Sequence, residues 1–196
     1  MKKAIYYILH WTWALPINII AGIVCLVCMC FKCPVHKYRN AVEIIVPWNF
    51  GGLEMGMFFI RGKDCESVAP HEYGHTIQTL WWGLLGLLVI SGPSAARYWI
   101  REQKTQAQKY IFAVGILVCA FILGAIVGII GIYLWYPLFI FALCFIAYAG
   151  GLFAWLCTSE IPKYAKPNPP KYDDIWFEGQ ATRLGNHANS GEWDWL

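Results

Sequence analysis

Apolar residues gather in two long stretches of the chain, and polar segments separate these from shorter elements. Residues 4–31 and residues 110–158 contain no charged side chain. A membrane-spanning helix needs about 20 apolar residues, so the first stretch predicts one membrane helix and the second predicts two that form a hairpin. We expect a kink near Pro16 in the first helix. We place the hairpin turn at Pro137, where neighbouring aromatic residues favour the membrane interface.

Between these stretches the pattern changes to short elements. Residues 41–60 hold two apolar, β-branched runs around the turn signal N-F-G-G, which predicts a β-hairpin. A helix is expected over residues 69–92, because a proline near its start suits a first helical turn and an apolar run follows. Another helix is expected over residues 173–187. The predicted fold class is a mainly α-helical membrane protein with a small β-hairpin or sheet.

Composition narrows the class further. Hydrophobic residues make up 58% of the 196 residues and charged residues 14%, whereas soluble domains average about 45–50% and about 25%. These figures exclude disordered, collagen-like and coiled-coil proteins. They indicate one small integral membrane domain over residues 1–196, with the lipid bilayer as its partner. The net charge of +3 is small and no basic run is dense, so we expect no nucleic-acid partner.

Eight cysteines raise the question of a metal cluster. Cys25, Cys28, Cys30 and Cys33 have the C-x2-C-x-C-x2-C spacing of a metal site. They lie within or beside the first apolar stretch, where cysteine behaves as a small hydrophobic residue. We favour this second interpretation, and the sequence leaves the role of the four thiols open.

Chemistry concentrates in the segment His71-Glu-Tyr-Gly-His75, which matches H-E-x-x-H. Histidines four positions apart lie about 40° apart around a helix, so both imidazoles face one point. Neutral imidazoles suit Zn²⁺, and Glu72 on the neighbouring face is positioned to accept a proton from a water molecule. Polar side chains at the head of an apolar helix favour a functional site over ordinary interfacial residues.

A catalytic zinc needs a third protein ligand and an open position. Glu178 is the best candidate, because it lies on a predicted helix whose small residues Gly179 and Ala181 allow close approach to the histidine helix. Asp173 and Asp174 are candidates either for orienting a ligand histidine or for capping this helix. The remaining histidines lie in the first membrane helix, a basic connector and the tail: His10, His36 and His187.

Three segments carry a resemblance to a known group: H-E-Y-G-H-T-I-Q at 71–78, G-P-S-A-A-R-Y-W at 92–99 and Y-D-D-I-W-F-E-G-Q-A-T at 172–182. Together they resemble small bacterial membrane proteins that are similar to gluzincin-type zinc metallopeptidases. The resemblance implies zinc bound by His71, His75 and Glu178, with Glu72 as general base for hydrolysis of a peptide or protein substrate. It also implies a zincin-like core. Residues 110–158 depart from the shorter members of the group, and we expect them to be a transmembrane hairpin inserted into that core.

Metallopeptidases of this kind commonly bind substrate as a strand added to a sheet edge beside the zinc helix. That mode puts Asn49, Gly51 and Gly52 near the edge, and an ordinary packing hairpin accounts for them equally well. Either Tyr73 or Tyr172 is a candidate to stabilise the oxyanion, and nothing in the sequence chooses between them.

Charges beside the apolar stretches predict orientation. The segments 97–109 and 159–196 flank the hairpin and are both basic, so we expect them on the cytoplasmic side of a bacterial inner membrane. The zinc site would then lie near that side, and residues 79–92 would be too short for a full span. A spanning first helix would leave Lys2 and Lys3 outside, against the usual charge bias, so a non-spanning first helix stays open.

Two further questions have alternatives. Ala120, Gly124 and Gly128 form a small-residue face that either packs against a neighbouring helix or supports a homo-oligomer.

The first rival to a peptidase is a non-catalytic zinc-binding protein, which predicts a closed site with Asp173 or Asp174 as fourth ligand. A transporter is disfavoured because the spans carry almost no polar residues. An intramembrane protease needs a zinc deep in the bilayer.

Overall fold

The computed structural model describes residues 2–190, and these are mostly helical with one small mixed β-sheet. Contacts between residues divide the chain into two compact units. We call Met1–Ile90 together with Tyr172–Leu196 the sheet unit, and Ser91–Lys171 the hairpin unit. Each unit is described by itself.

The sheet has four strands in the order β1-β2-β4-β3. Strand β1 pairs antiparallel with β2, β2 pairs parallel with β4, and β4 pairs antiparallel with β3. Strand β3 is therefore an edge strand. The strands are β1 (Val35–Tyr38), β2 (Ala41–Val46), β3 (Gly52–Met55) and β4 (Phe58–Gly62).

The predicted hairpin over residues 41–60 is wrong in its pairing. The two runs were expected to pair antiparallel, but β2 and β4 run parallel, because β3 intervenes and occupies the other edge of β4. The hairpin is instead β3–β4, and it turns at Gly56, whose φ of +69° is strained for a residue with a side chain. Strand β1 falls in the segment that was expected to be a basic connector without a strand.

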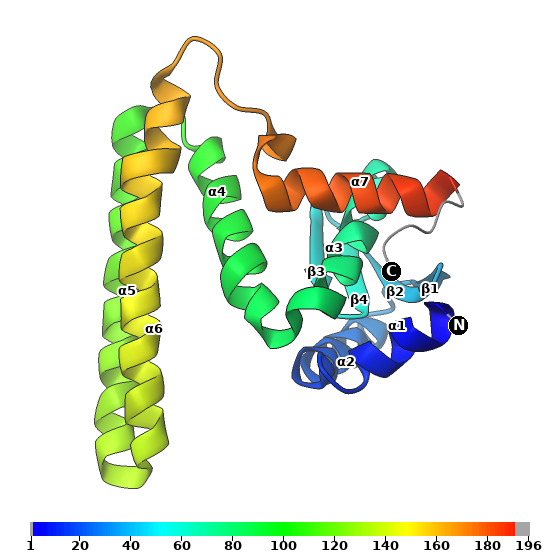
Figure 1. The fold of residues 1–196 in the computed structure, drawn as a ribbon, viewed down its shortest axis with the longest axis horizontal. Coiled ribbons are helices and arrows are strands. Elements are labelled where there is room, and N and C mark those ends of the chain that lie inside the picture. The colour runs from blue at the N-terminus through cyan, green and yellow to red at the C-terminus, as the bar shows by residue number, and fades with distance from the viewer. Residues whose placement is uncertain (1, 191–196) are drawn as a thin grey trace. The chain divides into compact units, whose positions relative to one another are not determined.

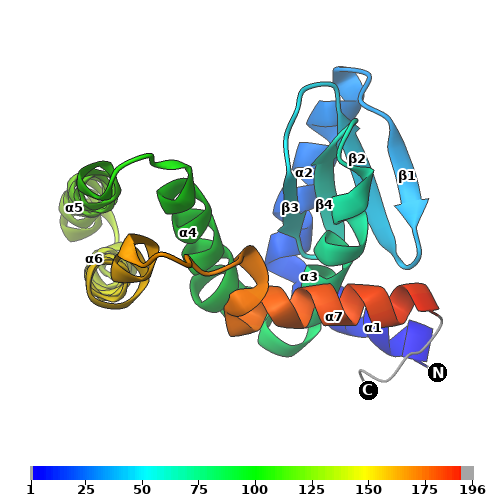
Figure 2. The ribbon, with the colours of Figure 1, turned by 90° about the horizontal axis from the view of Figure 1, so that it is seen from above.

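Helices cover both faces of the sheet. Helix α2 (Leu15–Cys30) packs across β2, β4 and β3, and helix α3 (Ala69–Trp82) packs across β3 and β4. Figure 2 shows α2 behind the sheet and α3 in front of it. Because side chains alternate along a strand, one face of each strand contributes to the apolar core with α2 and the other is available to α3.

The first apolar stretch is broken at residues 11–14, ahead of the kink that was expected near Pro16. Helix α1 (Lys2–His10) is followed by a bend of 88° before α2. Pro16 stands in the first turn of α2, where a missing N–H costs nothing, so it starts a helix instead of kinking one. Helix α2 ends with Lys32 at φ +58° and a bond of 3.0 Å from Cys33 N–H to the Cys28 carbonyl.

That helix end brings the side chains of Cys28 and Cys33 into contact. Such a contact across a helix end is usually hydrophobic. Within residues 2–190 the four cysteines do not form a group able to hold a metal ion. Their expected role as small hydrophobic residues accounts for this arrangement.

Among residues 2–190, two single helices are long and apolar enough to cross a membrane, and both belong to the hairpin unit. They are α5 (Gln106–Leu134) and α6, which with its continuation covers Tyr136–Ala165. They run side by side and turn at Trp135, two residues before the expected Pro137 (Figure 1). Ala120, Gly124 and Gly128 are buried, and a methyl group at position 124 would overlap Ile146 of α6. These three residues therefore pack inside the hairpin. A homo-oligomer formed by the same face stays a prediction.

A buried ion pair fixes the open end of the hairpin. Arg97 of α4 (Gly92–Glu102) lies 2.6 Å from Glu160, and each side chain is only 1% exposed. Lys163 contributes a second cation to Glu160 at 2.9 Å. Charges this deeply buried persist only when paired, so the pair holds α4 to the end of α6.

Candidate metal centre

Helix α3 carries the H-E-x-x-H motif on its first two turns. Pro70 stands in the first turn and starts the helix, as expected. His71 and His75 follow one turn apart with ring centroids separated by 4.7 Å. Helix α3 stops at Gly83, whose φ of +50° breaks the helical path, so the predicted continuation to residue 92 is replaced by short 3-10 and π segments.

Helix α7 (Trp176–Ser190) crosses α3 at very short range (Figure 1). A methyl group at Gly74 would overlap the Ala181 carbonyl oxygen, and one at Gly185 would overlap that of Pro70. Small residues at both crossing points therefore let the two backbones touch. The expected role of Ala181 fits this crossing, whereas Gly179 faces the Asp173 carbonyl instead.

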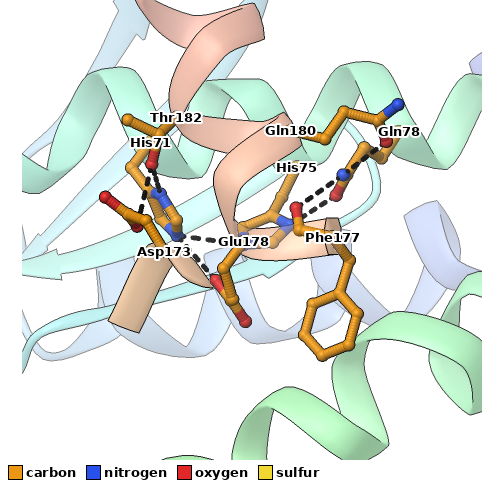
Figure 3. Close-up of polar contacts among 8 residues, drawn as sticks. All are labelled: His71, His75, Gln78, Asp173, Phe177, Glu178, Gln180 and Thr182. Carbon is orange, nitrogen blue, oxygen red and sulfur yellow. Dashed lines mark hydrogen bonds and ion pairs between the residues drawn. The ribbon is translucent and has the colours of Figure 1, made fainter. Parts of the chain in front are cut away.

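The crossing brings one acidic side chain to the two histidines. The Nε2 atoms of His71 and His75 are 3.1 Å apart. Glu178 Oε2 lies 3.1 Å from the first nitrogen and 3.3 Å from the second. Three potential ligand atoms from two helices thus converge on one point, as Figure 3 shows.

Hydrogen bonds fix which ring nitrogen of His75 carries a proton. Gln78 Nε2 donates to the Phe177 carbonyl and to Gln180 Oε1, both at 2.8 Å. A main-chain carbonyl only accepts, so the other end of the Gln78 amide, Oε1, faces His75 Nδ1 at 2.8 Å and accepts its proton. The Nε2 lone pair of His75 is therefore directed to the point shared with Glu178.

His71 is oriented by the same logic through a different chain of groups. Thr182 Oγ1 donates to Asp173 Oδ1 at 3.1 Å, because a carboxylate only accepts. Its oxygen then accepts from His71 Nδ1 at 2.8 Å, which leaves His71 Nε2 to face the shared point. Asp173 thus orients a ligand histidine, one of its two expected roles, but acts through Thr182.

Three acceptor atoms this close to one another repel unless a positive charge lies among them. Without a metal, that charge is a proton. Burial alone would lower the pKa of His75, but the hydrogen bond to Glu178 and the charges of Glu72, Glu178 and Glu54 outweigh it and raise the pKa to about 9. A divalent cation meets the same electrostatic need more fully.

The donor set and its spacing fit zinc. Two imidazole nitrogens and a carboxylate oxygen are a known catalytic ligand set, and ligands at about 2.0–2.1 Å around a tetrahedral ion are separated by about 3.3 Å. Within residues 2–190, no further His, Cys, Asp or Glu joins the three ligands. The chemistry of the side chains thus accommodates a tetrahedral ion with an open fourth position, while the identity of the metal rests on this fit alone.

Glu72 lies against the edge strand of the sheet. A methyl group at Gly52 would overlap the Glu72 carboxylate, so the absence of a side chain at position 52 makes room for it. Burial raises the pKa of Glu72 and the charge of Glu178 adds to the rise, while the two histidines oppose it. A carboxylate with a raised pKa is a better proton acceptor than an exposed one.

The structure distributes the other candidate residues unequally. Gly52 begins the edge strand β3, and Asn49 and Gly51 precede it in the connecting loop. The ring of Tyr172 lies 5.7 Å from that of His71. Tyr73 is fully buried between the rings of other tyrosines and is not brought to the three ligands. Asp174 lies in the short 3-10 turn before α7 and is absent from the ligand group.

Three contributors to the site were not singled out from the sequence. Gln78 and Thr182 lie within the two motif blocks, but their roles depend on atoms of another helix. Glu54 of β3 accepts a hydrogen bond from Thr79 at 2.8 Å, and burial raises its pKa to about 7. For Gln78, the sequence signal that could have indicated its role is its position about one helical turn after His75.

Comparison of the chain with protein-family models, curated proteins and solved structures finds no match. The convergence of His71, His75 and Glu178 therefore stands on the geometry and chemistry of this chain alone.

Proposed function

We propose that the protein is a zinc-dependent membrane metallopeptidase with Glu72 as general base. One observation carries the proposal: three oriented ligand atoms converge while a buried glutamate of the same motif lies beside them. The resemblance to gluzincin-type peptidases and a zincin-like core belong to this proposal. So does a position near the cytoplasmic side, which the Lys and Arg residues close to both ends of the hairpin favour.

Zinc held by His71, His75 and Glu178 would supply a Lewis acid that polarises a carbonyl and lowers the pKa of water. Glu72 would take a proton from the attacking water and pass it to the leaving amine. Because Glu72 is buried, its pKa is raised above that of a carboxylate in water, which makes it a stronger proton acceptor. Gln78 and Thr182 would keep both imidazole rings oriented through the cycle.

Strand β3 would receive the substrate. It is the edge strand next to Glu72, and an extended peptide that paired with it would pass beside the ligand triad. Tyr172, near His71, is the better supported of the two oxyanion candidates, because Tyr73 is committed to the core.

The rival function is a non-catalytic zinc protein. It requires a closed site with Asp173 or Asp174 as the fourth ligand. Asp173 already accepts a hydrogen bond from Thr182, and the ligand group within the described chain has three members. These observations favour an open, catalytic site.

Metal content and a peptide-library digest test the proposal. Purified protein should contain about one zinc per chain, and His75→Ala and Glu178→Ala should lose it. Incubated with a mixed peptide library in detergent, the native protein should yield products that Glu72→Gln, which keeps all three ligands, does not. Zinc bound without any difference between native protein and Glu72→Gln would favour the rival function.

A further inference from the structure

The sheet unit exposes a large apolar surface of its own, separate from the two membrane helices of the hairpin unit. Its sequence has no Asp, Glu, Lys or Arg over 4–31 or over 73–90. Both segments present large apolar side chains that are about half exposed, among them Trp11, Trp13, Ile20, Leu26, Leu84 and Leu85. A soluble surface seldom carries a continuous apolar patch of this kind.

The two segments form one surface because they touch at their bends. The indole of Trp13, between α1 and α2, lies against Gly83, where α3 ends. Any side chain at position 83 would overlap that indole, and the φ of +50° there also favours glycine. Two bends, each in a charge-free segment, therefore meet at one place.

Two polar side chains at the first bend, Asn18 and Thr12, make their hydrogen bonds within the protein. Asn18 Nδ2 donates to the His10 carbonyl at 2.6 Å, and Asn18 Oδ1 accepts from Met57 N–H at 2.7 Å. Thr12 Oγ1 donates to the Ile8 carbonyl at 2.7 Å. Hydrocarbon demands that polar groups be satisfied within the protein, and an aqueous surface does not.

The dimensions of the bend favour a loop over a span. Helices α1 and α2 have 9 and 16 residues, which makes them about 14 and 24 Å long, shorter than the roughly 30 Å of bilayer hydrocarbon. They meet at 88°. Lys3 and Lys32 stand at the two outer ends and are exposed. A bend that enters and returns on one side keeps both cations in water on that side, as charge bias prefers.

We infer that the α1–α2 bend and the end of α3 together form a re-entrant wedge, whose partner is the lipid bilayer. The wedge enters the membrane from one side and returns to it without crossing. Trp81 follows His75 by six residues, about 9 Å along the helix, so the metal centre lies at the boundary between lipid and water. This inference stands on exposure, bends and hydrogen bonds, and it does not depend on peptidase activity.

Spin labels on the full-length protein in lipid nanodiscs test it. The label is attached to p-acetylphenylalanine, so the native cysteines stay in place. On the wedge, this residue replaces Ile20 or Leu85. Ile126 of α5 serves as the lipid reference and Lys37 of β1 as the water reference, since both are exposed. Positions 23 and 84 replace either wedge site if a labelled variant does not fold.

Wedge labels should collide with oxygen more than with a water-soluble nickel complex, as at Ile126 and opposite to Lys37. Collision with the nickel complex at the level of Lys37 would overturn the inference. Protection from both reagents would also overturn it, because protein, such as a second copy of the chain, would then cover the patch.

A second measurement separates a loop from a span. Labels at Lys3 and Lys37 are reduced by external ascorbate in sealed vesicles with a biased protein orientation. Equal reduced fractions are expected for a re-entrant bend. Complementary fractions would show that α1–α2 crosses the bilayer and would overturn the wedge.

Discussion

The side chain of Gln78 makes three contacts that together determine how His75 presents its ring. It accepts from His75 Nδ1 and donates to Phe177 and Gln180 of α7. One carboxamide therefore orients a ligand and fixes the backbone beside the third ligand, Glu178. Partners of this kind hold a metal site ready before the ion arrives.

Replacing Gln78 tests this role. Gln78→Met fills similar space but has no hydrogen-bonding groups, so we expect zinc affinity to fall about 10- to 100-fold. Gln78→Glu keeps the acceptor for His75 and loses both donors, so an intermediate loss is expected. Competition with a chromophoric chelator measures these affinities.

Tyr6→Phe is the matched control. It removes a buried hydrogen bond of 2.9 Å from the Tyr6 hydroxyl to Thr76 of α3, a bond in which neither Gln78 nor any of the three candidate ligands takes part. Its zinc affinity should equal that of the native protein. If Gln78→Met behaves like this control, the carboxamide does not position His75.

Glu54 predicts a pH dependence of stability. Its pKa in the folded, metal-free protein is about 7, above the ordinary 4.5, because burial disfavours the charged form. The folded state thus holds a proton that the unfolded chain releases between those values, so the free energy of unfolding falls as pH rises through that window. Glu54→Gln cannot ionise and should remove the Glu54 contribution to this loss, on the order of 3 kcal/mol by pH 8. The fall that comes from the raised pKa of His75, above pH 6.5, should remain.

Thermal unfolding in detergent with a chelator, from pH 5 to pH 8, measures the effect. Glu66→Gln, at an exposed position outside the site, should keep the slope of the native protein. A native slope retained by Glu54→Gln would show that another group is responsible.

At the scale of elements, the crossing of α3 and α7 creates the candidate metal centre. Neither helix holds three ligands by itself. Gly74 and Gly185 allow the backbones to touch, and the touching backbones bring Glu178 within 3.3 Å of both imidazole nitrogens. The glycines at the crossing are therefore as necessary to the site as its ligands.

Gly74→Ala should separate the helices and remove zinc. The added methyl group meets the Ala181 backbone, which has no rotamer to change, so α7 must move. We expect zinc content in purified protein to fall to near zero. Gly22→Ala on α2 is the control, because nothing lies within 4 Å of its added methyl group; it should keep zinc and gain about 0.5–1 kcal/mol. Full zinc occupancy in Gly74→Ala would contradict the role of the crossing.

At the scale of the whole molecule, the three candidate ligands all belong to the sheet unit. The two helices long and apolar enough to cross a membrane belong to the hairpin unit of the described chain. Metal removal should therefore act on one unit. Zinc at 1,000 times its dissociation constant stabilises the folded state by about 4 kcal/mol. Chelation should raise amide hydrogen exchange in α3 and α7 and leave α5 and α6 unchanged. Mass spectrometry measures this exchange. An equal rise of amide hydrogen exchange in both units would show that the two units unfold together.

The elements that depend on local pattern were predicted from the sequence. Long charge-free stretches gave the hairpin helices, and the spacing of His71 and His75 gave a shared helix face, because both follow from the period of one helix. The mostly helical fold with a small sheet is confirmed. The pairing of β2 with β4 was missed, because parallel pairing depends on which strand fills the remaining edge and not on either strand's own residues.

The sequence by itself determined the apolar segments and the H-E-x-x-H face, and it singled out Glu178 as the best candidate for a third ligand. Only the tertiary structure decided that Glu178 reaches the histidines, that Gln78 and Thr182 orient them, and that Tyr73 belongs to the core. The physical reason is distance along the chain. A helix period relates residues four apart, whereas the contact between His75 and Glu178 exists only after two helices, joined at their glycines, have packed together.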